Sequence, residues 1–279
     1  MGRLRPPFLF DLCSMKILGI LNITEDSFSD GGRFLVPDAA EAHGAAMLKA
    51  GADILDIGAA SSNPDAQPVP PELEIERLNS VLPALKEKGA VISIDSFVPQ
   101  VQRWALSQGV AYLNDIHGFA EPAFYPELAK SNAQLILMYA VLSRGIATRD
   151  DIPREEIFDR VASFFEGRIE ALTRAGIDRE RLILDPGMGF FVGSDPENSL
   201  ILLRRLPELK KRFGLPLLIS VSRKSFLRKL TGRQAGEAGA ASLAAELFAD
   251  ANGADYIRTH APGALRDGLN VLKAIGNGR

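Results

Sequence analysis

Residues 16–21 read Lys-Ile-Leu-Gly-Ile-Leu, and the polar residue Asn22 follows directly. A short apolar run without polar alternation is typical of a parallel strand that is buried on both faces. Seven further runs of four to six residues share this character, at 53–57, 91–95, 111–114, 134–139, 181–185, 217–221 and 254–258. The opening run is therefore one unit of a pattern that occurs eight times along the chain.

Amphipathic segments with helical spacing separate these runs, for example 72–88, 155–175 and 238–251. Alternation of strands and helices predicts parallel βαβ units, and eight units closed into a barrel need roughly 250 residues. The chain has 279 residues and no linker-like tract divides it. We therefore expect a single (β/α)8 TIM barrel over residues 15–279. An open doubly wound sheet is the alternative, but no Gly-rich phosphate loop follows the first strand.

The composition, with 46% hydrophobic and 24% charged residues, is that of an ordinary soluble globule. A net charge of -3 argues against a nucleic-acid partner, which requires a basic face. The single cysteine, Cys13, excludes an intrachain disulfide and favours the cytoplasm. The apolar run Phe8-Leu9-Phe10 stops at Asp11 and is too short for the apolar core of a signal peptide. We therefore expect residues 1–14 to form a flexible leader, with Met15 as an alternative start. No apolar stretch approaches the roughly 18 residues of a membrane span.

Polar side chains stand at the carboxyl end of almost every predicted strand. They are Asn22, Asp56, Asp95, Asn114, Asp115, Asp185, Ser222, Arg223, Lys224, Arg258 and His260. A single such residue is readily explained as a helix cap or a turn residue. In a barrel, however, these ends converge on the face where the strand–helix loops build the active site, and their recurrence favours a site.

The polar residues also divide by charge along the chain. The acids follow the second, third, fourth and sixth strands, whereas Lys224, Arg258 and His260 follow the seventh and eighth. Acidic side chains on one side suit a neutral heterocycle that is rich in hydrogen-bond donors. Cations on the other side suit a phosphate or diphosphate, which barrels often bind beside the last two strands. The three histidines are too scattered for a zinc site, and no serine-nucleophile motif is present.

Two connections, 22–37 and 58–71, exceed the usual length of such loops, and we expect them to cover the site and exclude water. Phe190 and Phe191 follow the Gly-rich turn after Asp185. They either form the wall of a site for a ring-shaped ligand or cap the barrel core.

Taken together, these stretches are similar to the dihydropteroate synthase family. The matching motifs occur in the family's order between about residues 16 and 275: GILNITEDSFSDGGR (19–33), DIG (56–58), ISID (92–95), NDIHG (114–118), ILDPGMGF (183–190), SRKS (222–225) and IRTH (257–260). The resemblance implies a barrel enzyme of folate biosynthesis, usually homodimeric. Such an enzyme joins 7,8-dihydropterin-6-ylmethyl diphosphate to 4-aminobenzoate and releases diphosphate.

The resemblance also assigns roles to single residues. Four of them would hold the pterin: Asp95, Asn114, Asp185 and Lys224. Asp95, Asp185 and Lys224 would form the catalytic set. Three would hold the diphosphate: Asn22, Arg258 and His260. Asn22 would in addition contact a magnesium ion, and Ser225 would reach the carboxylate of the aminobenzoate.

Two loops depart from the common family pattern. Residues 59–64 read Ala-Ala-Ser-Ser-Asn-Pro, and Phe190-Phe191 carries an extra aromatic residue. The resemblance places both loops beside the aminobenzoate, which would then contact Ser62, Pro64, Phe190 and Phe191. The combination resembles the sulfonamide-insensitive subgroup, because an inserted Phe would narrow the space that a bulkier drug needs.

A third departure is Tyr139, which stands where the family usually has histidine, so no histidine role is carried over to that position.

Two alternatives remain at this stage. One is a pterin-binding barrel of the methyltetrahydrofolate or corrinoid methyltransferase type, and the other is a non-catalytic pterin binder. Neither requires a diphosphate site, so the presence of Asn22, Lys224, Arg258 and His260 favours the synthase.

Overall fold

The computed structural model describes residues 15–23, 37–60, 68–143, 146–147 and 152–277. The principal strands are β1 (Lys16–Asn22), β2 (Ile54–Gly58), β3 (Ile92–Asp95), β4 (Tyr112–Asp115), β5 (Gln134–Met138), β8 (Leu182–Asp185), β9 (Leu218–Ile219) and β10 (Tyr256–Thr259). A short hairpin is formed by β6 (Leu142–Ser143) and β7 (Ile146–Ala147). The helices are α1 (Pro37–Lys49), α2 (Pro71–Glu87), α3 (Pro99–Ser107), α4 (Tyr125–Lys130), α5 (Ile157–Arg174), α6 (Pro196–Arg204), α7 (Leu206–Phe213), α8 (Ser225–Thr231), α9 (Gly239–Ala251) and α10 (Pro262–Asn277).

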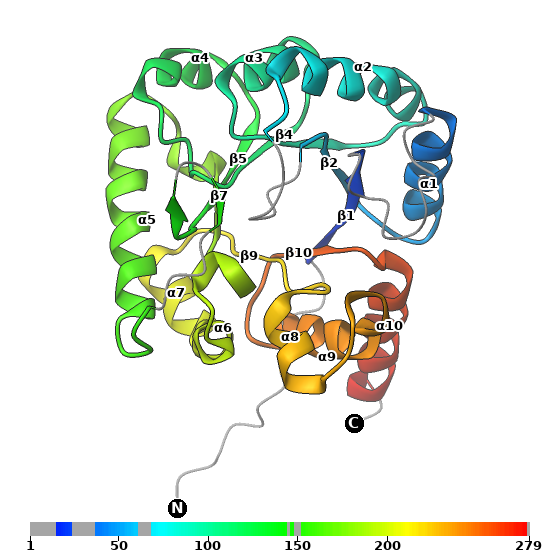
Figure 1. Ribbon diagram of the computed structural model, residues 1–279, viewed down its shortest axis with the longest axis vertical. Coiled ribbons are helices and arrows are strands. Elements are labelled where there is room, and N and C mark those ends of the chain that lie inside the picture. The colour runs from blue at the N-terminus through cyan, green and yellow to red at the C-terminus, as the bar shows by residue number, and fades with distance from the viewer. Residues whose placement is uncertain (1–14, 24–36, 61–67, 144–145, 148–151, 278–279) are drawn as a thin grey trace, which may run out of the picture.

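The principal strands form one parallel sheet in the order β8-β5-β4-β3-β2-β1-β10-β9. A parallel bridge between Leu184 and Leu217 joins the two ends of this order, so the sheet closes into a barrel with the helices outside (Figure 1). The predicted TIM barrel is confirmed, and the open sheet is excluded. All eight predicted strands are found, with ends that differ by at most two residues from the expected bounds.

Two hydrophobic layers hold the barrel together. The larger lies between strands and helices, where Leu55 and Ile57 of β2 pack in one cluster with Leu82 of α2. The smaller cluster, which we call the barrel plug, consists of Leu18, Ile54, Tyr112, Ile136, Ile183 and Leu218. Its members come from different strands, and each alternates with a residue of the outer layer, as a period of two requires.

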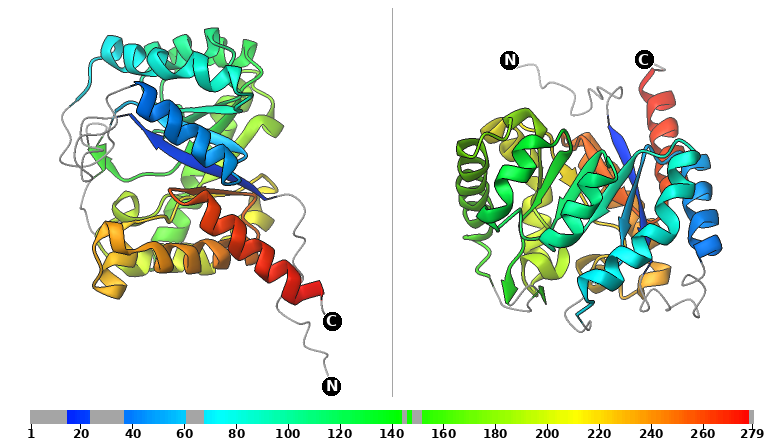
Figure 2. Two further views of the ribbon diagram at one scale, coloured as in Figure 1. Left: turned by 90° about the vertical axis from the view of Figure 1, so that its right-hand side faces the viewer. Right: turned by 90° about the horizontal axis from the view of Figure 1, so that it is seen from above.

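Two residues beyond the plug, most of the side chains that face the barrel interior are polar. This strand-end layer contains Asp56, Asn114, Asp185 and Arg258, and Asp95 joins it from β3. Figure 2 shows that α10 ends beside the start of β1, at the opposite end of the barrel. The strand-end layer therefore lies at the carboxyl face, which is the face seen in Figure 1.

Several predictions fall on segments outside the described residues. These are the leader 1–14 with Cys13, the residues Ser62 and Pro64, and most of the loops 22–37 and 58–71. Among the described helices, none combines the length and the hydropathy that a membrane crossing requires.

Candidate active site

Asp56 is the centre of the strand-end layer. Its carboxylate is fully buried and accepts hydrogen bonds from Ser93 Oγ at 2.5 Å, Asn114 Nδ2 at 3.2 Å and Arg258 Nε at 2.5 Å. A buried carboxylate is costly unless it is paired and hydrogen-bonded, and three donors from three strands meet this requirement. Asp56 therefore ties β2, β3, β4 and β10 together at the floor of the site. The sequence showed Asp56 at a strand end but assigned it no role.

Arg258 lies between two carboxylates. Besides its bond to Asp56, its Nη2 donates to Asp95 Oδ2 at 2.6 Å. Burial alone would lower the pKa of Arg258, but the charges of Asp56 and Asp95 outweigh it and raise that pKa. The expected separation into an acidic and a basic side is therefore wrong for Arg258, which sits within the acidic group. Burial raises the pKa of Asp95 to about 7, although Arg258 opposes the shift.

Asp185 and Lys224 form a second group in the site. Asp185 ends β8, and its Oδ1 accepts a hydrogen bond from Gly187 N at 2.8 Å. Burial raises the pKa of Asp185 to about 6. Burial, followed by the charge of Arg258, lowers the pKa of Lys224 to about 8, although Asp185 and Asp95 oppose this shift. An acid and an amine with pKa values displaced toward neutrality are typical of a functional site.

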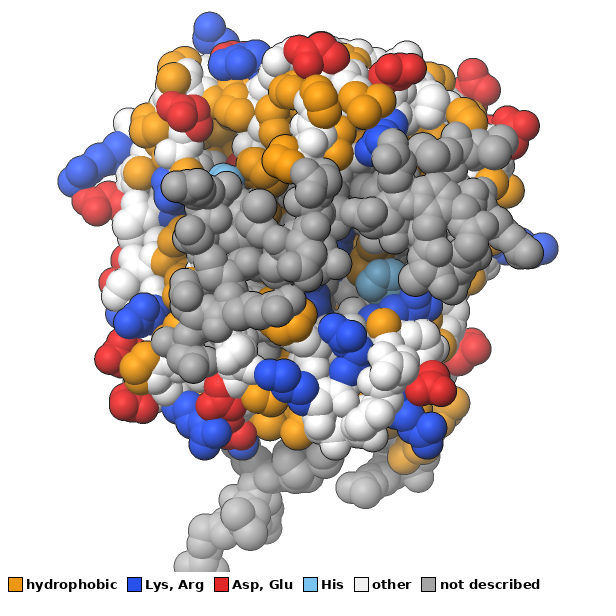
Figure 3. Space-filling model, viewed as in Figure 1, with side chains coloured by type: hydrophobic (Ala, Val, Ile, Leu, Met, Phe, Trp, Pro, Cys, Tyr) orange, Lys and Arg blue, Asp and Glu red, His pale blue; other side chains and the backbone are white. Residues whose placement is uncertain are grey.

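The cationic part of the site lies around His260, which follows β10. Figure 3 shows cationic side chains and a histidine around the hollow in the carboxyl face. Burial, and then the charges of Arg223, Arg258 and Lys224, lower the pKa of His260 to about 3. The ring is therefore neutral at pH 7 and lies in a cationic environment. A bound anion would stabilise this environment.

Asn22 ends β1 at the same face and is exposed. Its Oδ1 lies 3.6 Å from the position that a Cβ atom on Gly58 would occupy.

Phe191 combines the two roles that the sequence left open. It is 8% exposed and packs in one cluster with Ile116 and Met138, with Phe190 at the edge of that cluster. Its ring centroid also lies 4.5 Å from Lys224 Nζ, within the range of a cation–π contact. Phe191 is therefore both a cap on the barrel interior and a wall of the site.

Ser225 begins α8 beside the Gly-rich turn. A Cβ atom on Gly189, which has φ +68°, would lie 3.0 Å from Ser225 Oγ, so this close approach requires glycine.

Tyr139 is turned away from the site. It belongs to the outer hydrophobic layer and packs edge-on against Phe164, with a ring-centroid distance of 5.4 Å. Met138, the preceding residue, faces the interior instead.

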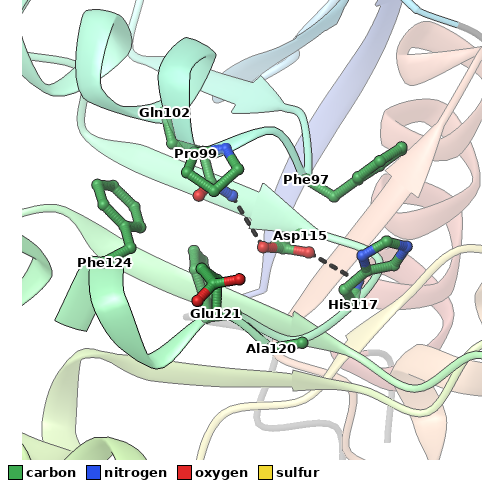
Figure 4. A pocket seen from close by; sticks show the side chains of 9 residues that line it. Phe97, Pro99, Gln102, Asp115, His117, Ala120, Glu121 and Phe124 are labelled. Atoms are coloured by element: carbon green, nitrogen blue, oxygen red, sulfur yellow. Dashed lines mark hydrogen bonds between the residues drawn. The ribbon is translucent and has the colours of Figure 1, made fainter. Parts of the chain in front are cut away.

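Asp115 also points away from the cluster, so its predicted place among the site acids is wrong. Its Oδ2 accepts from Gln102 Nε2 at 2.8 Å, and its Oδ1 accepts from His117 N at 2.7 Å (Figure 4). It lines a separate pocket of about 160 Å³ beside α3, with Phe97, Phe119 and Glu121 among the other lining residues. Asn114 faces inward, so the alternation along β4 directs Asp115 outward. The ring of His117 also lines this pocket and lies against the ring of Phe97, with a centroid distance of 4.3 Å.

The fold and the site together define a barrel enzyme that binds a pterin, and the family model described as pterin binding enzyme matches residues 18–260. The chain is 60% identical over 262 residues to dihydropteroate synthase type-2 of Escherichia coli, with 94% of this chain and 96% of that protein covered. The chain belongs to the dihydropteroate synthases.

Solved structures agree with this relationship. The dihydropteroate synthase of Xanthomonas albilineans in complex with 7,8-dihydropteroate is 35% identical, with a TM-score of 0.82 over 95% of each chain. The Yersinia pestis dihydropteroate synthase with a sulfonamide drug complex is 31% identical, with a TM-score of 0.87 over 96% of each chain.

Proposed function

We propose that this chain joins a 7,8-dihydropterin-6-ylmethyl diphosphate to 4-aminobenzoate in folate biosynthesis. The observation that carries the proposal is the placement of Asp185 and Lys224 beside the network of Asp56, Arg258 and Asp95. The edge of a pterin ring offers N–H donors and carbonyl or ring-nitrogen acceptors. Carboxylates suit those donors, and the Lys224 ammonium suits the acceptors.

The reaction forms one bond and breaks one. The amine nitrogen of 4-aminobenzoate attacks the pterin methylene carbon, and the bond from that carbon to the diphosphate oxygen breaks. The electron pair leaves on the diphosphate, and the amine loses a proton to water. Because an arylamine is mostly unprotonated near pH 7, the reaction needs no strong base. Arg258 and His260 would stabilise the charge that develops on the leaving group.

Magnesium is part of the proposal, and the residues present fit a shared site rather than a closed one. No group of three or more His, Cys, Asp or Glu residues in the described ranges converges as a metal site. Mg²⁺ is often bound by one or two protein oxygens together with substrate phosphates and waters. The amide oxygen of Asn22 at the rim fits this arrangement. When bound, the ion would neutralise charge on the diphosphate.

The experiment is release of diphosphate from the dihydropterin substrate, with and without 4-aminobenzoate and Mg²⁺. We expect release to require both, and Lys224→Met to lower kcat/KM by roughly 10²-fold or more. Lys229→Met is the matched control, because Lys229 is exposed on α8, the helix that begins directly after Lys224. Pterin binding without turnover would instead support the methyltransferase-type or the non-catalytic binder.

We further propose that Phe191 excludes sulfonamides and so confers sulfonamide resistance. A sulfonamide copies the aminobenzoate ring but extends farther beyond it, so a wall that tolerates the substrate rejects the drug. The packing of Phe191 against Lys224, Ile116 and Met138 supports a rigid wall. Deleting Phe191 should lower the sulfonamide inhibition constant by about tenfold or more, which corresponds to about 1.4 kcal/mol. An unchanged inhibition constant, with the KM for aminobenzoate also unchanged, would contradict the proposal.

The proposal includes a homodimer that works in the cytoplasm. Exposed apolar side chains on α8, α9 and α10 support an interface there: Leu230, Phe248, Val271 and Ile275. Light scattering of the purified chain, repeated on Phe248→Glu, measures the oligomeric state directly. A monomer at micromolar concentration would exclude the dimer.

A further inference from the structure

Glu246 is a buried carboxyl group behind the diphosphate side of the site. It lies on α9, is 2% exposed, and its Oε1 has no hydrogen-bond partner in the part of the chain that the structure describes. The rest of α9 consists largely of small and apolar residues. A carboxyl group in such surroundings costs free energy, so its contacts indicate what it does.

The Glu246 carboxyl interacts with the hydroxyl groups of Thr259 and Ser222, and both interactions act against the rise in its pKa that burial causes. Both residues lie next to the site. Thr259 ends β10 and directly precedes His260, and Ser222 follows β9. Backbone bonds hold these residues in place, because His260 N donates to Ser222 Oγ at 3.2 Å and Ala261 N donates to Thr259 Oγ1 at 3.1 Å. The carboxyl group therefore lies against the turn that carries His260.

Ser222 connects Glu246 to the imidazole ring. Its Oγ lies 3.0 Å from Nδ1 of His260. A serine hydroxyl has one proton and can accept from other donors. If that proton goes to the Glu246 carboxylate, the Ser222 oxygen must accept from Nδ1–H of His260. This arrangement leaves Nε2 as the ring atom without a proton.

We propose that Glu246 is a positioning residue for the transfer reaction, which acts through Ser222 to fix the Nδ1–H tautomer of His260 and to stabilise its imidazolium form when diphosphate binds. This inference rests on the proposed function, because it takes His260 as a ligand of the diphosphate. Nε2 takes a proton from water as the diphosphate enters and donates it in a hydrogen bond to a phosphate oxygen. The Glu246 carboxylate balances the new positive charge across the Ser222 hydroxyl.

We call the series Glu246–Ser222–His260 the relay. The charges around it make support for the imidazolium form of His260 necessary. The groups that act on the His260 ring are Arg223, Arg258, Lys224 and His43, and all of them oppose protonation of the ring. The Glu246 carboxyl interacts with Ser222 and Thr259, and burial raises its pKa to about 7. Because this pKa lies near neutral, the carboxylate form of Glu246 is accessible at pH 7 and can balance the positive charge that the ring gains.

Asp250 provides a matched control. It lies one turn farther along α9, burial also raises its pKa, and its Oδ2 has no hydrogen-bond partner within the described ranges. Asp250 is half-buried, whereas Glu246 is fully buried, but both are acids with an unpartnered oxygen. Asp250 shows no interaction with Ser222 or His260 among the described contacts. Comparing the two residues separates the relay from the general effect of removing a buried acid from α9.

The first test is the ¹⁵N spectrum of the His260 imidazole in the full-length protein, titrated with inorganic diphosphate. In the wild type we expect an Nδ1–H ring that becomes doubly protonated as diphosphate binds. In Glu246→Gln we expect a mixture of tautomers and binding of diphosphate weakened by about tenfold. Asp250→Asn should behave as the wild type. An Nε2–H ring in the wild type, or the same spectra in Glu246→Gln, would overturn the relay.

The second test is steady-state kinetics with both substrates. Glu246→Gln should lower kcat/KM for the dihydropterin diphosphate by about tenfold and leave the KM for 4-aminobenzoate unchanged. Ser222→Ala should add little to Glu246→Gln, because the two residues act as one unit. Equal losses in Glu246→Gln and Asp250→Asn would show a merely structural role. Absence of turnover in the wild type would contradict the proposed function, whereas the imidazole spectrum tests the relay independently.

Discussion

The barrel plug and the strand-end layer lie on the same strands, two residues apart, yet they have opposite character. Ile54, Tyr112 and Ile183 belong to the plug, and Asp56, Asn114 and Asp185 follow them in the layer above. All six are almost inaccessible to solvent. Burial alone therefore does not distinguish a site from a core. The change of residue type along an unchanged alternation marks where the ligand is expected to bind.

The two layers also differ in how they are stabilised. Apolar side chains in the plug gain about 25 cal/mol for each Å² removed from water. The charged groups above lose hydration, so each depends on its partners. A truncation in the plug should change the free energy of unfolding and leave the chemistry intact. A truncation in the strand-end layer should leave a buried charge without its partner.

The largest stability effect is expected from Asp56→Ala. The substitution removes the shared acceptor of Ser93, Asn114 and Arg258. Breaking a buried ion pair costs about 3–5 kcal/mol, because the remaining charge is uncompensated. Urea denaturation should show this loss in the free energy of unfolding. The control is Glu127→Ala, which breaks the exposed pair with Arg103 and should cost about 1 kcal/mol or less. Equal losses in both variants would contradict the comparison.

A smaller effect on stability, and none on chemistry, is expected from Ile136→Ala. Ile136 is fully buried in the plug, and its truncation leaves a cavity. Such substitutions typically cost about 2–5 kcal/mol, so the midpoint of urea denaturation should fall. The KM values for both substrates should stay at the wild-type level in molecules that remain folded. A changed KM for the pterin substrate would show that the two layers are coupled.

Much of this contrast can be read from the sequence. The eight strands, the closed barrel and the polar strand ends all follow from short apolar runs, almost all of which stop at a polar residue. The sequence predicted that Asp185 and Lys224 lie on one face, because Asp185 ends a strand and Lys224 lies in the turn that follows the next one, and the structure brings their charges together. Such local patterns suffice, since parallel strands bring their carboxyl ends to one face.

Other features needed the three-dimensional arrangement. Asp115 was assigned to the site, but a shift of one residue along β4 turns its side chain toward α3. The pairing of Arg258 with Asp56 joins residues that are 202 positions apart, and no local pattern predicts it. Glu246 lies on a helix rather than at a strand end. Its sequence signal is only that, like Asp250 one turn later, it interrupts a run of small and apolar residues.

The smallest effect is a pH dependence that distinguishes the two layers. Burial raises the pKa of Asp185 to about 6, and burial with the charge of Arg258 lowers that of Lys224 to about 8. Below pH 6 Asp185 becomes protonated and neutral, and above pH 8 Lys224 loses its proton. We therefore expect kcat/KM for the pterin substrate to be bell-shaped, falling about tenfold per pH unit beyond each limb. Burial also raises the pKa of Asp95 to about 7, so Asp185→Asn should weaken the acid limb without abolishing it. Ile136→Ala should keep both limbs, and a profile without limbs in the wild type would contradict the role of this pair.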